Sequence, residues 1–293
     1  MVDAVILAGA DNEGPLKDLD PARYEALIEI NGKPMVGYVI DAIAGARGIG
    51  NIVVVGPGEA LESAPGLIDE HIPAGRVRFA NRGRSILENL DIGVRELGAG
   101  AQDRVFVATG DLPLLTSGAV EDFLERCEKL DSDICYSVVT KETNDARFSG
   151  IKRTYMKIAD GVLTGGNVMV VRPAAIDKCR KLVDMAVVSR KKPWLMLSVL
   201  GVRCAVKFLF GTLRVRDIEE RFHRLTGLKG SGVFTPYAEI AMDVDKPAHL
   251  EFARSVLGSV SAGGARAGSA GAGSAGSGGA AASSAGAGQR SGC

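Results

Sequence analysis

The sequence predicts an α/β protein with a Rossmann-like three-layer α/β/α fold, built on a mostly parallel mixed sheet with a β-rich insertion. The apolar run at residues 5–9 ends in small residues before a polar loop, as a buried parallel strand does where it meets a ligand. Strand-like and helix-like patterns then alternate as far as residue 140, which favours βαβ units. A hydrophobic content of 46% over 293 residues is enough for one large core.

The first half of the chain supports this class element by element. Residues 26–30 are expected to form a short extended piece, and residues 34–44 have the apolar spacing of an amphipathic helix. Ser85 and Glu88 have capping-box spacing, so they predict a helix over 86–97. A further helix is expected from about 116 to 130. Strands are expected at 52–55, 77–80, 104–109 and 134–139.

The alternation of strand-like and helix-like patterns ends after residue 140. Residues 150–172 have a strand, turn, strand pattern, with a turn at 160–161 and strands expected at 153–158, 162–164 and, after the stretch 165–167, 168–171. They predict a β-rich excursion over the ligand edge of the sheet. The almost wholly apolar stretch 193–211 is interrupted by Arg203 and Lys207, which favours a buried or half-buried helix pair over a membrane span. Further along, a polar helix is expected at 217–225, a last strand at 238–244 and a last helix that ends near residue 257.

Composition divides the chain into a domain and a tail. Residues 1–257 are expected to form a single domain, within which 180–225 is a basic and apolar helical subregion. Residues 258–293 consist almost entirely of Gly, Ala and Ser, a composition that cannot bury enough apolar surface to order itself. We therefore expect this tail to be disordered.

Charge and cysteine usage exclude several classes of protein. The 35 basic and 35 acidic residues balance, so no global electrostatic attraction to nucleic acid is expected. The five cysteines form no CxxC pair and match neither a zinc site nor a disulfide scaffold. The start of the chain lacks the pattern of a signal peptide. A reduced, cytoplasmic setting is expected, with no integral membrane segment.

Three aspartates are candidate metal ligands. Asp111 follows the expected strand at 104–109, which places its carboxylate at the ligand edge of the sheet. Asp243 and Asp245 follow the last expected strand and could supply a second ligand. Carboxylates together with phosphate oxygens are how Mg²⁺ is commonly held, and such a site would stabilise in-line attack on a triphosphate. Taken alone, each aspartate could equally cap a turn or a helix.

An ordered series of motifs resembles the nucleotidyltransferase superfamily, and most of all its molybdenum cofactor guanylyltransferase-like NTP transferase domains. The series lies at residues 7–9, 26–35, 110–113, 165–167 and 243–247, and the likeness covers roughly residues 1–255. The resemblance implies a Rossmann-like three-layer fold and a Mg²⁺-dependent reaction that joins an NTP to a phosphorylated acceptor and releases pyrophosphate. A sugar phosphate, an alcohol phosphate and a molybdopterin-like compound are the acceptors that it implies.

The resemblance also assigns roles to residues. It places the base and ribose of the nucleotide against Leu7, Ala8 and Gly9. It gives further reading of the base to Asn81, Gly83 and Ser85. It brings the acceptor to Gly165, Gly166 and Asn167. It makes Asp111 a metal ligand, with Asp243 or Asp245 as the second.

Two departures from the family pattern concern the triphosphate. The loop at residues 10–17 carries extra acids where family members have a Gly-rich loop containing Arg. Glu25 stands where family members carry a Lys, and a carboxylate there would repel a triphosphate. We therefore expect Lys17 or Arg23 to supply the catalytic cation.

Two other functions stay open from the sequence. A glycosyltransferase that uses a nucleotide sugar shares a metal-binding aspartate at the sheet edge. A catalytically inactive nucleotide-binding or regulatory protein would account for Glu25. A dinucleotide oxidoreductase is disfavoured, because no GxGxxG follows the first strand. The expected partners are an NTP and a phosphorylated small-molecule acceptor, without nucleic acid, and a homodimer is left open.

Overall fold

The computed structural model describes residues 1–151, 153–189 and 193–268. The chain divides into two units, Met1–Leu257 and Gly258–Cys293. The last helix, α9 (Pro247–Gly268), does not end near residue 257 as predicted, so the first part of the expected disordered tail is helical. Extending an existing helix costs much less than nucleating one, which offsets the glycines in this segment. Residues 269–293 of the predicted tail lie outside the described residues.

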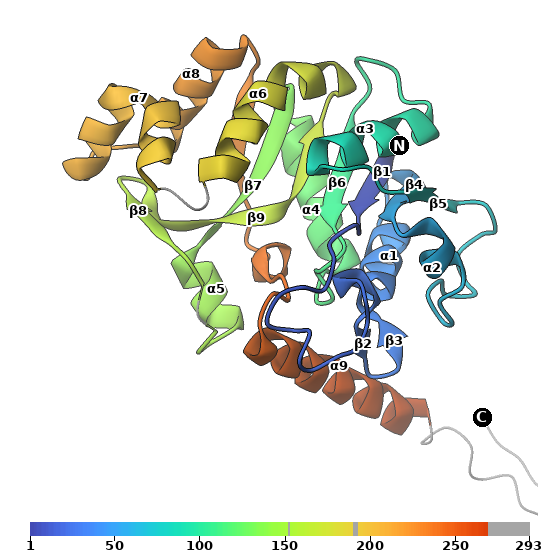
Figure 1. Ribbon diagram of the computed structural model, residues 1–293. Coiled ribbons are helices and arrows are strands. Elements are labelled where there is room, and N and C mark those ends of the chain that lie inside the picture. Colours follow the sequence, from blue (N-terminus) through green and yellow to red (C-terminus); the bar gives the residue numbers. More distant parts are fainter. Residues whose placement is uncertain (152, 190–192, 269–293) are drawn as a thin grey trace, which may run out of the picture. The chain divides into compact units, whose positions relative to one another are not determined.

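The first unit is built on a mixed sheet (Figure 1). Its strands, in spatial order, are β10 (Gly230–Phe234), β7 (Ile134–Thr140), β9 (Gly161–Val171), β6 (Val105–Thr109), β1 (Val2–Leu7), β4 (Ile49–Gly56) and β5 (Val77–Asn81). The short strand β8 (Met156–Ile158) pairs with β9. Among the strand pairs of the main sheet, those of β9 with β6, β7 and β8 are antiparallel. The predicted α/β class with a mostly parallel mixed sheet is confirmed.

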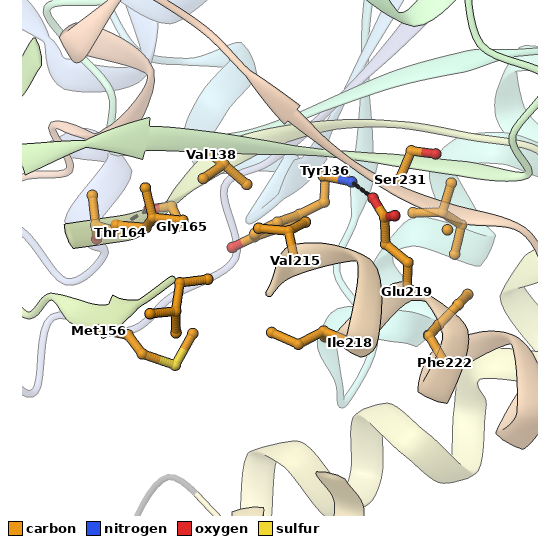
Figure 2. A pocket seen from close by; sticks show the side chains of 15 residues that line it. Tyr136, Val138, Met156, Thr164, Gly165, Val215, Ile218, Glu219, Phe222 and Ser231 are labelled. Atoms are coloured by element: carbon orange, nitrogen blue, oxygen red, sulfur yellow. Dashed lines mark hydrogen bonds between the residues drawn. The ribbon is translucent and has the colours of Figure 1, made fainter. Parts of the chain in front are cut away.

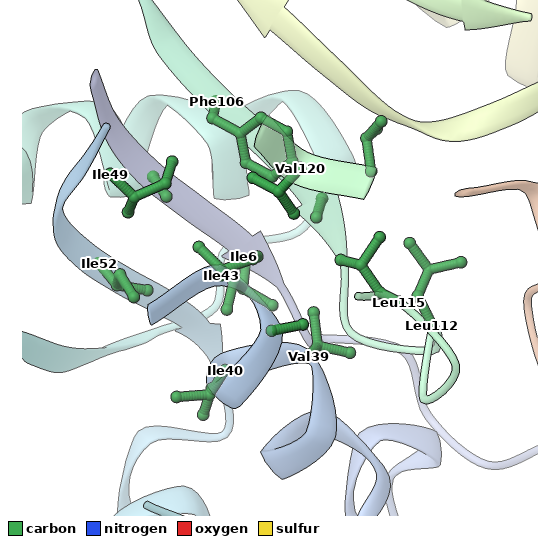
Figure 3. Packing of buried hydrophobic residues seen from close by; sticks show 14 of the residues in the cluster. Ile6, Val39, Ile40, Ile43, Ile49, Ile52, Phe106, Leu112, Leu115 and Val120 are labelled. Atoms are coloured by element: carbon green, nitrogen blue, oxygen red, sulfur yellow. The ribbon is translucent and has the colours of Figure 1, made fainter. Parts of the chain in front are cut away.

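Helices cover both faces of this sheet and complete the three layers. One face is covered by α1 (Met35–Gly45) and α4 (Ser117–Glu128), whose apolar side chains pack with Ile6 and Phe106 from the central strands (Figure 3). The other face is covered by α3 (Ile86–Leu97) and α6 (Pro173–Ser189), which pack against Val5 and its neighbours. Adjacent residues of β1 therefore belong to opposite cores, as the two-residue period of a strand requires.

Helix α3 forms where the capping signal predicts it. The Ser85 hydroxyl accepts a hydrogen bond of 3.2 Å from the backbone N–H of Glu88, and Gly98 ends the helix in a left-handed conformation at φ 69°. The Glu88 carboxylate does not complete the box at Ser85, because it accepts the backbone N–H of Arg84 at 2.7 Å instead. The Glu88 side chain therefore holds the backbone of Arg84, the residue just before the N-cap Ser85.

Two predicted strands have a different structure. Residues 26–30 are divided between a 3₁₀ turn, η1 (Glu25–Leu27), and a two-residue strand, β2 (Glu29–Ile30), which pairs with β3 (Lys33–Pro34). The predicted strand at 238–244 begins instead as a second 3₁₀ turn, η2 (Ala238–Ala241). Its residues are buried, as those of a strand would be, but β10 takes the adjacent edge of the sheet beside β7.

The turn predicted at 160–161 lies at the junction of β8 and β9, but the expected interruption at 165–167 is absent, because these residues continue strand β9 between β6 and β7. The β-rich segment is therefore part of the main sheet and not an excursion over its edge. The two glycines let strand β9 pack closely against side chains of β7. A Cβ on Gly165 would lie 2.8 Å from the Tyr136 hydroxyl oxygen, and one on Gly166 would lie 2.3 Å from the Ser137 hydroxyl oxygen. The register with β7 shifts between Tyr136 and Val138, at this same position.

The remaining helices are α2 (Gly58–Glu62), α5 (Lys141–Arg147), α7 (Pro193–Leu209) and α8 (Val215–Thr226). Helix α7 is interrupted at Gly201, where φ is 79°. Beyond this break Cys204 is buried, but Val202 is 80% exposed and Leu209 is 81% exposed, so this segment is less buried than the predicted buried or half-buried helix pair. No helix within the described residues has the length and apolarity needed to cross a membrane.

Candidate active site

The candidate active site lies at the carboxyl ends of β1 and β6. Asp111 follows β6 directly after Gly110, and its backbone carbonyl accepts the N–H of Val244 at 2.9 Å, which joins the segment after η2 to this edge. The Thr109 hydroxyl donates a hydrogen bond to the Asp111 carboxylate. Burial, followed by the negative charge of Asp243, raises the pKa of Asp111 to about 7. Asp111 is thus a carboxyl beside a second acid at the edge of the sheet, and its role as a metal ligand stays a prediction.

Asp243 is the acid that lies with Asp111. Its Oδ1 accepts a hydrogen bond of 3.0 Å from the Asn167 side-chain amide and lies 2.8 Å from a terminal nitrogen of Arg153. The structure therefore brings together Asp111, Asp243 and Asn167, which are far apart in the sequence. Arg153, whose side chain is 10% exposed, was missed in the sequence because nothing local distinguishes it from other surface arginines.

Asp245, the other candidate for a second ligand, has a different partner. Its carboxylate lies 2.8 Å from Nδ1 of the buried His249, and its side chain is half exposed. It still affects the site, because its charge contributes, after burial, to the raised pKa of Glu25. Of the two candidates, the structure places Asp243 beside Asp111 and Asp245 beside His249.

A small cavity of about 30 Å³ lies between the strand ends. Its lining includes two carboxylic residues, Glu25 and Asp111, and small or apolar residues at the ends of β1 and β6. These others are Leu7, Ala8, Ala10, Ala26 and Gly110. The cavity is large enough for one water molecule or one small ion. Leu7 and Ala8, predicted to contact the nucleotide, thus lie beside the acidic residues.

The loop after β1 is held by Arg82, a residue that was missed in the sequence. Its guanidinium binds both carboxylate oxygens of Asp11, at 2.8 and 2.9 Å, and donates to the backbone carbonyl of Gly9. Arg82 also lies over the Tyr24 ring at 5.1 Å, and Arg23 lies over the same ring at 5.4 Å. This pairing lowers the pKa of Asp11, first through the hydrogen bond to Arg82. The sequence did contain an indication of its role, since Arg82 lies between Asn81 and Gly83, which were both predicted to contact the base.

The two cations predicted for catalysis lie at the surface of this region. Arg23 is exposed and belongs to the layer on Tyr24, and its charge also lowers the pKa of Asp11. Lys17 is exposed on the same loop, where its backbone N–H bonds to the carbonyl of Gly14 at 3.2 Å. Their role in catalysis stays a prediction.

Of the predicted base-reading residues, Gly83 contacts Asn89 of α3, which also lies close to Gly9. Its side-chain oxygen accepts the Gly83 N–H at 2.7 Å, and a Cβ on Gly9 would lie 2.9 Å from its side-chain nitrogen. The other two have structural partners. The Asn81 side-chain oxygen accepts the Gly58 N–H at 3.1 Å, and the Ser85 hydroxyl caps α3. Contact of these residues with a base stays a prediction.

The acids of the site could hold a metal ion only with help from another molecule. Within the part of the chain that the structure describes, no group of three or more His, Cys, Asp or Glu side chains is arranged to hold a metal ion. Asp111 and Asp243 form a pair close enough for one charge to raise the pKa of the other. Magnesium typically takes one or two carboxylates and completes its shell with waters and substrate phosphates. The donor set therefore fits Mg²⁺ that arrives together with a nucleotide.

The fold and this acidic edge together define an α/β protein with a candidate nucleotide site. Comparison with known families identifies the family. The chain belongs to the MobA-like NTP transferase domain family, whose model matches residues 22–205, more than half of its length. The matched span includes Glu25, Arg82 and Asp111. The proposed partner Asp243 lies beyond it, so its position beside Asp111 comes from the structure.

Solved structures of similar fold are transferases. A hypothetical transferase from Thermus thermophilus is 31% identical and aligns over 85% of this chain and 99% of that one, with a TM-score of 0.71. A CMP:2-keto-3-deoxy-manno-octonic acid synthetase complexed with CTP aligns over 88% of this chain and 99% of that one. Its TM-score is 0.53 and its identity is 14%, so this likeness shows the fold alone.

Curated relatives match part of the chain. An 8-amino-3,8-dideoxy-manno-octulosonate cytidylyltransferase of Shewanella halifaxensis is 28% identical over 134 residues, which is 43% of this chain and 53% of the relative. A 2-C-methyl-D-erythritol 4-phosphate cytidylyltransferase of Streptomyces avermitilis is 30% identical over 109 residues, which is 36% of this chain and 43% of the relative. The chain thus spans about half the length of these relatives.

Proposed function

We propose that this protein is a Mg²⁺-dependent nucleotidyltransferase that joins an NTP to a phosphorylated acceptor and releases pyrophosphate. The observation that carries the proposal is the pairing of Asp111 with Asp243 at the carboxyl edge of the sheet, in a chain of the MobA-like NTP transferase family. CTP is the first candidate for the donor, because similar proteins are named as cytidylyltransferases.

The reaction requires two charged reactants to approach each other. An oxygen of the acceptor phosphate attacks the α-phosphorus of the NTP in line, the new P–O bond forms, and the bond to the bridging oxygen of the β-phosphate breaks. Pyrophosphate leaves with that pair of electrons. Positioning and neutralisation of negative charge are the main tasks of a protein in such a transfer.

Asp111 and Asp243 would hold Mg²⁺ at this edge. When bound there, the ion would draw charge from the α-phosphate and orient its oxygens. The Asn167 amide and the Arg153 guanidinium both bind Asp243, so they fix the direction of its carboxylate. Arg153 is also a cation of this edge and is suited to an acceptor phosphate.

Arg82 extends the set of cations proposed for the triphosphate. Its guanidinium is planar and suited to phosphate, and it already donates to the backbone carbonyl of Gly9, just after β1. A triphosphate would compete with Asp11 for this guanidinium. Arg23, which shares the Tyr24 ring with Arg82, and Lys17 are the other cations of this loop.

A screen for pyrophosphate release tests the proposal. Each of the four NTPs is incubated with Mg²⁺ and a sugar phosphate, an alcohol phosphate or molybdopterin, with Asp111→Asn as the inactive reference and the exposed Asp18→Asn as the matched control. Release that needs both substrates and fails only in Asp111→Asn supports the proposal.

A nucleotide-binding protein without catalysis is the second candidate, because the Glu25 carboxylate lines the same cavity as Asp111. Mg²⁺-dependent NTP binding without release for any acceptor would favour it. In that case Glu25→Lys tests whether Glu25 blocks the reaction, because it puts a Lys where family members carry one. Release that appears only in Glu25→Lys would establish that this chain has lost the reaction through Glu25.

A further inference from the structure

A second and larger pocket lies on a face of the sheet, under helix α8 (Figure 2). Its volume is about 400 Å³, within the range of small-molecule sites. Strands β7, β8, β9 and β10 form one side, and α8 forms the other. The apolar side chains of this lining include Val138, Met156, Leu163, Val215, Ile218 and Phe222.

The lining of this pocket selects against polar molecules. Its one carboxylate, that of Glu219, accepts the backbone N–H of Gly232 at 2.8 Å, so it is held against β10 (Figure 2). A sugar placed among Val138, Ile218 and Phe222 would lose hydrogen bonds to water and find few replacements. An alkyl or prenyl chain has no such cost and gains from leaving water. The pocket therefore fits an apolar chain.

Strand β9 contributes residues both to the pocket and to the candidate active site. Thr164 and Gly165 line its end, and Asn167, two residues further along, donates its hydrogen bond to Asp243. Two residues of a strand span about 7 Å. A ligand with its chain in the pocket could therefore place its head group at the acidic edge, on the side where the resemblance predicts the acceptor.

The charges around the pocket keep an anionic head group outside it. Arg214, which precedes the lining residue Val215, is exposed. The Asp160 carboxylate accepts the Val215 N–H at 2.7 Å. The Glu219 carboxylate would keep an anion out of the pocket itself, so the chain enters and the charged head stays at the rim or the edge.

We propose that this pocket binds the apolar chain of the acceptor, which is then an amphiphilic phosphate ester and not a sugar phosphate. This assignment rests on the proposed nucleotidyl transfer for its acceptor role. The binding of an alkyl phosphate in the pocket can be measured without any turnover. The two parts are therefore separately testable.

The test is calorimetric titration of the full-length protein with n-butyl, n-hexyl and n-octyl phosphate, with glycerol phosphate as the reference that has no apolar chain. Burial of each methylene tightens binding by about fourfold, until the pocket is full. We expect the dissociation constant to fall at this rate along the series, with Mg²⁺ and CTP present or absent. Equal affinity for all four phosphates would overturn the proposal.

Two variants locate the binding. Met156→Trp fills the mouth of the pocket at a side chain that is already 37% exposed, and Ile218→Glu places a charge inside it. Leu225→Trp is the matched control, since Leu225 lies on α8, is 42% exposed and does not line the pocket. Thermal melting checks that each variant is folded. We expect either pocket variant to remove the dependence on chain length and the control to keep it.

The outcomes separate the pocket from the reaction. Chain-length dependence that Met156→Trp abolishes supports the pocket, and transfer to octyl phosphate but not to glucose 1-phosphate supports the acceptor class. Transfer to glucose 1-phosphate that Met156→Trp leaves unchanged overturns the acceptor class while the nucleotidyltransferase proposal stands. Octyl phosphate binding in the pocket with no pyrophosphate release from any NTP overturns the acceptor role and the proposed function, and leaves only a lipid-binding site.

Discussion

Strand β9 contributes to two regions of opposite chemistry. At the acidic edge, Asn167 binds Asp243, and the nearby Asp111 carboxyl is buried with a raised pKa. In the apolar pocket, Leu163 and Gly165 face a space that has almost no polar lining. The acidic edge lies where the strands end and loops begin. The pocket lies where helix α8 covers a face of the sheet. One strand thus contributes to a charged region and to an apolar region within a few residues.

The largest effect is expected from Asp111→Asn. Removing one of two acidic ligands should weaken Mg²⁺-dependent NTP binding by about 100-fold or more, since the metal interaction is worth several kcal/mol. The binding of octyl phosphate in the pocket should not change. Fluorescence titration with a labelled NTP measures the first affinity and calorimetry the second. A parallel loss of both would show that the two regions are one unit.

The same variant should change the pH dependence of stability. Because the pKa of Asp111 is raised from 3.8 to about 7, its contribution without metal is present below about pH 4 and is lost as pH rises through about 7. Asp111→Asn should lack this loss, so its melting temperature at pH 8 should equal or exceed that of the wild type. Saturating Mg²⁺ and NTP should stabilise only the wild type. A lower melting temperature for Asp111→Asn at pH 8 would contradict the buried, raised carboxyl.

A smaller effect is expected from Arg82→Ala. It frees the Asp11 carboxylate and removes a cation from the loop, so NTP affinity should fall by about tenfold. Stability should change little, because the ion pair is partly exposed. Arg84→Ala, at an exposed neighbour, is the matched control. Equal NTP affinity in both variants would exclude Arg82 as the cation that binds the triphosphate and leave Lys17 and Arg23 as the candidates.

Gly166→Ala tests the boundary between the two regions. Its Cβ would lie 2.3 Å from the Ser137 hydroxyl oxygen and 2.7 Å from a methyl carbon of Ile240, so the strand must shift, at about 1–3 kcal/mol of stability. Chemical denaturation measures the loss, and the double variant with Ser137→Ala should recover part of it. Full stability with weakened acceptor binding would instead favour the role predicted from the resemblance.

No effect on stability is expected from deleting residues 260–293. The deleted part has a composition that cannot form a core, although its first residues continue α9. Deleting residues 250–293 is the contrasting case, because it removes the buried Leu250 and Ala253 and should unfold the domain. A loss of several degrees in the melting temperature after the shorter deletion would show that the tail is docked.

Local patterns predicted the elements that local physics decides. The Ser85 cap and the Gly98 end of α3 depend on neighbours within one helical turn, so the sequence places both. Asp111 could also be placed, because a carboxylate after a buried strand lies at the sheet edge wherever the other strands are. The family resemblance then gave the class of reaction to test.

Features that depend on distant contacts were missed or misread. In the sequence, Gly165 and Gly166 look like a break between two strands, and only Tyr136 and Ser137 on the neighbouring strand show that they permit close packing. The strand predicted at 238–244 failed because β10 occupies that edge of the sheet. Propensity cannot foresee such competition, since two segments of similar character differ only in what the rest of the chain leaves free.

The sequence by itself determined the α/β class, the helix caps and the acid at the end of β6, because each follows from the spacing of residues within a few turns. Only the tertiary structure decided that Asp243 and not Asp245 joins Asp111, that Arg82 binds Asp11, and that a pocket lies under α8. These contacts join segments tens of residues apart. Their formation depends on the order of strands in the sheet, which no local pattern encodes.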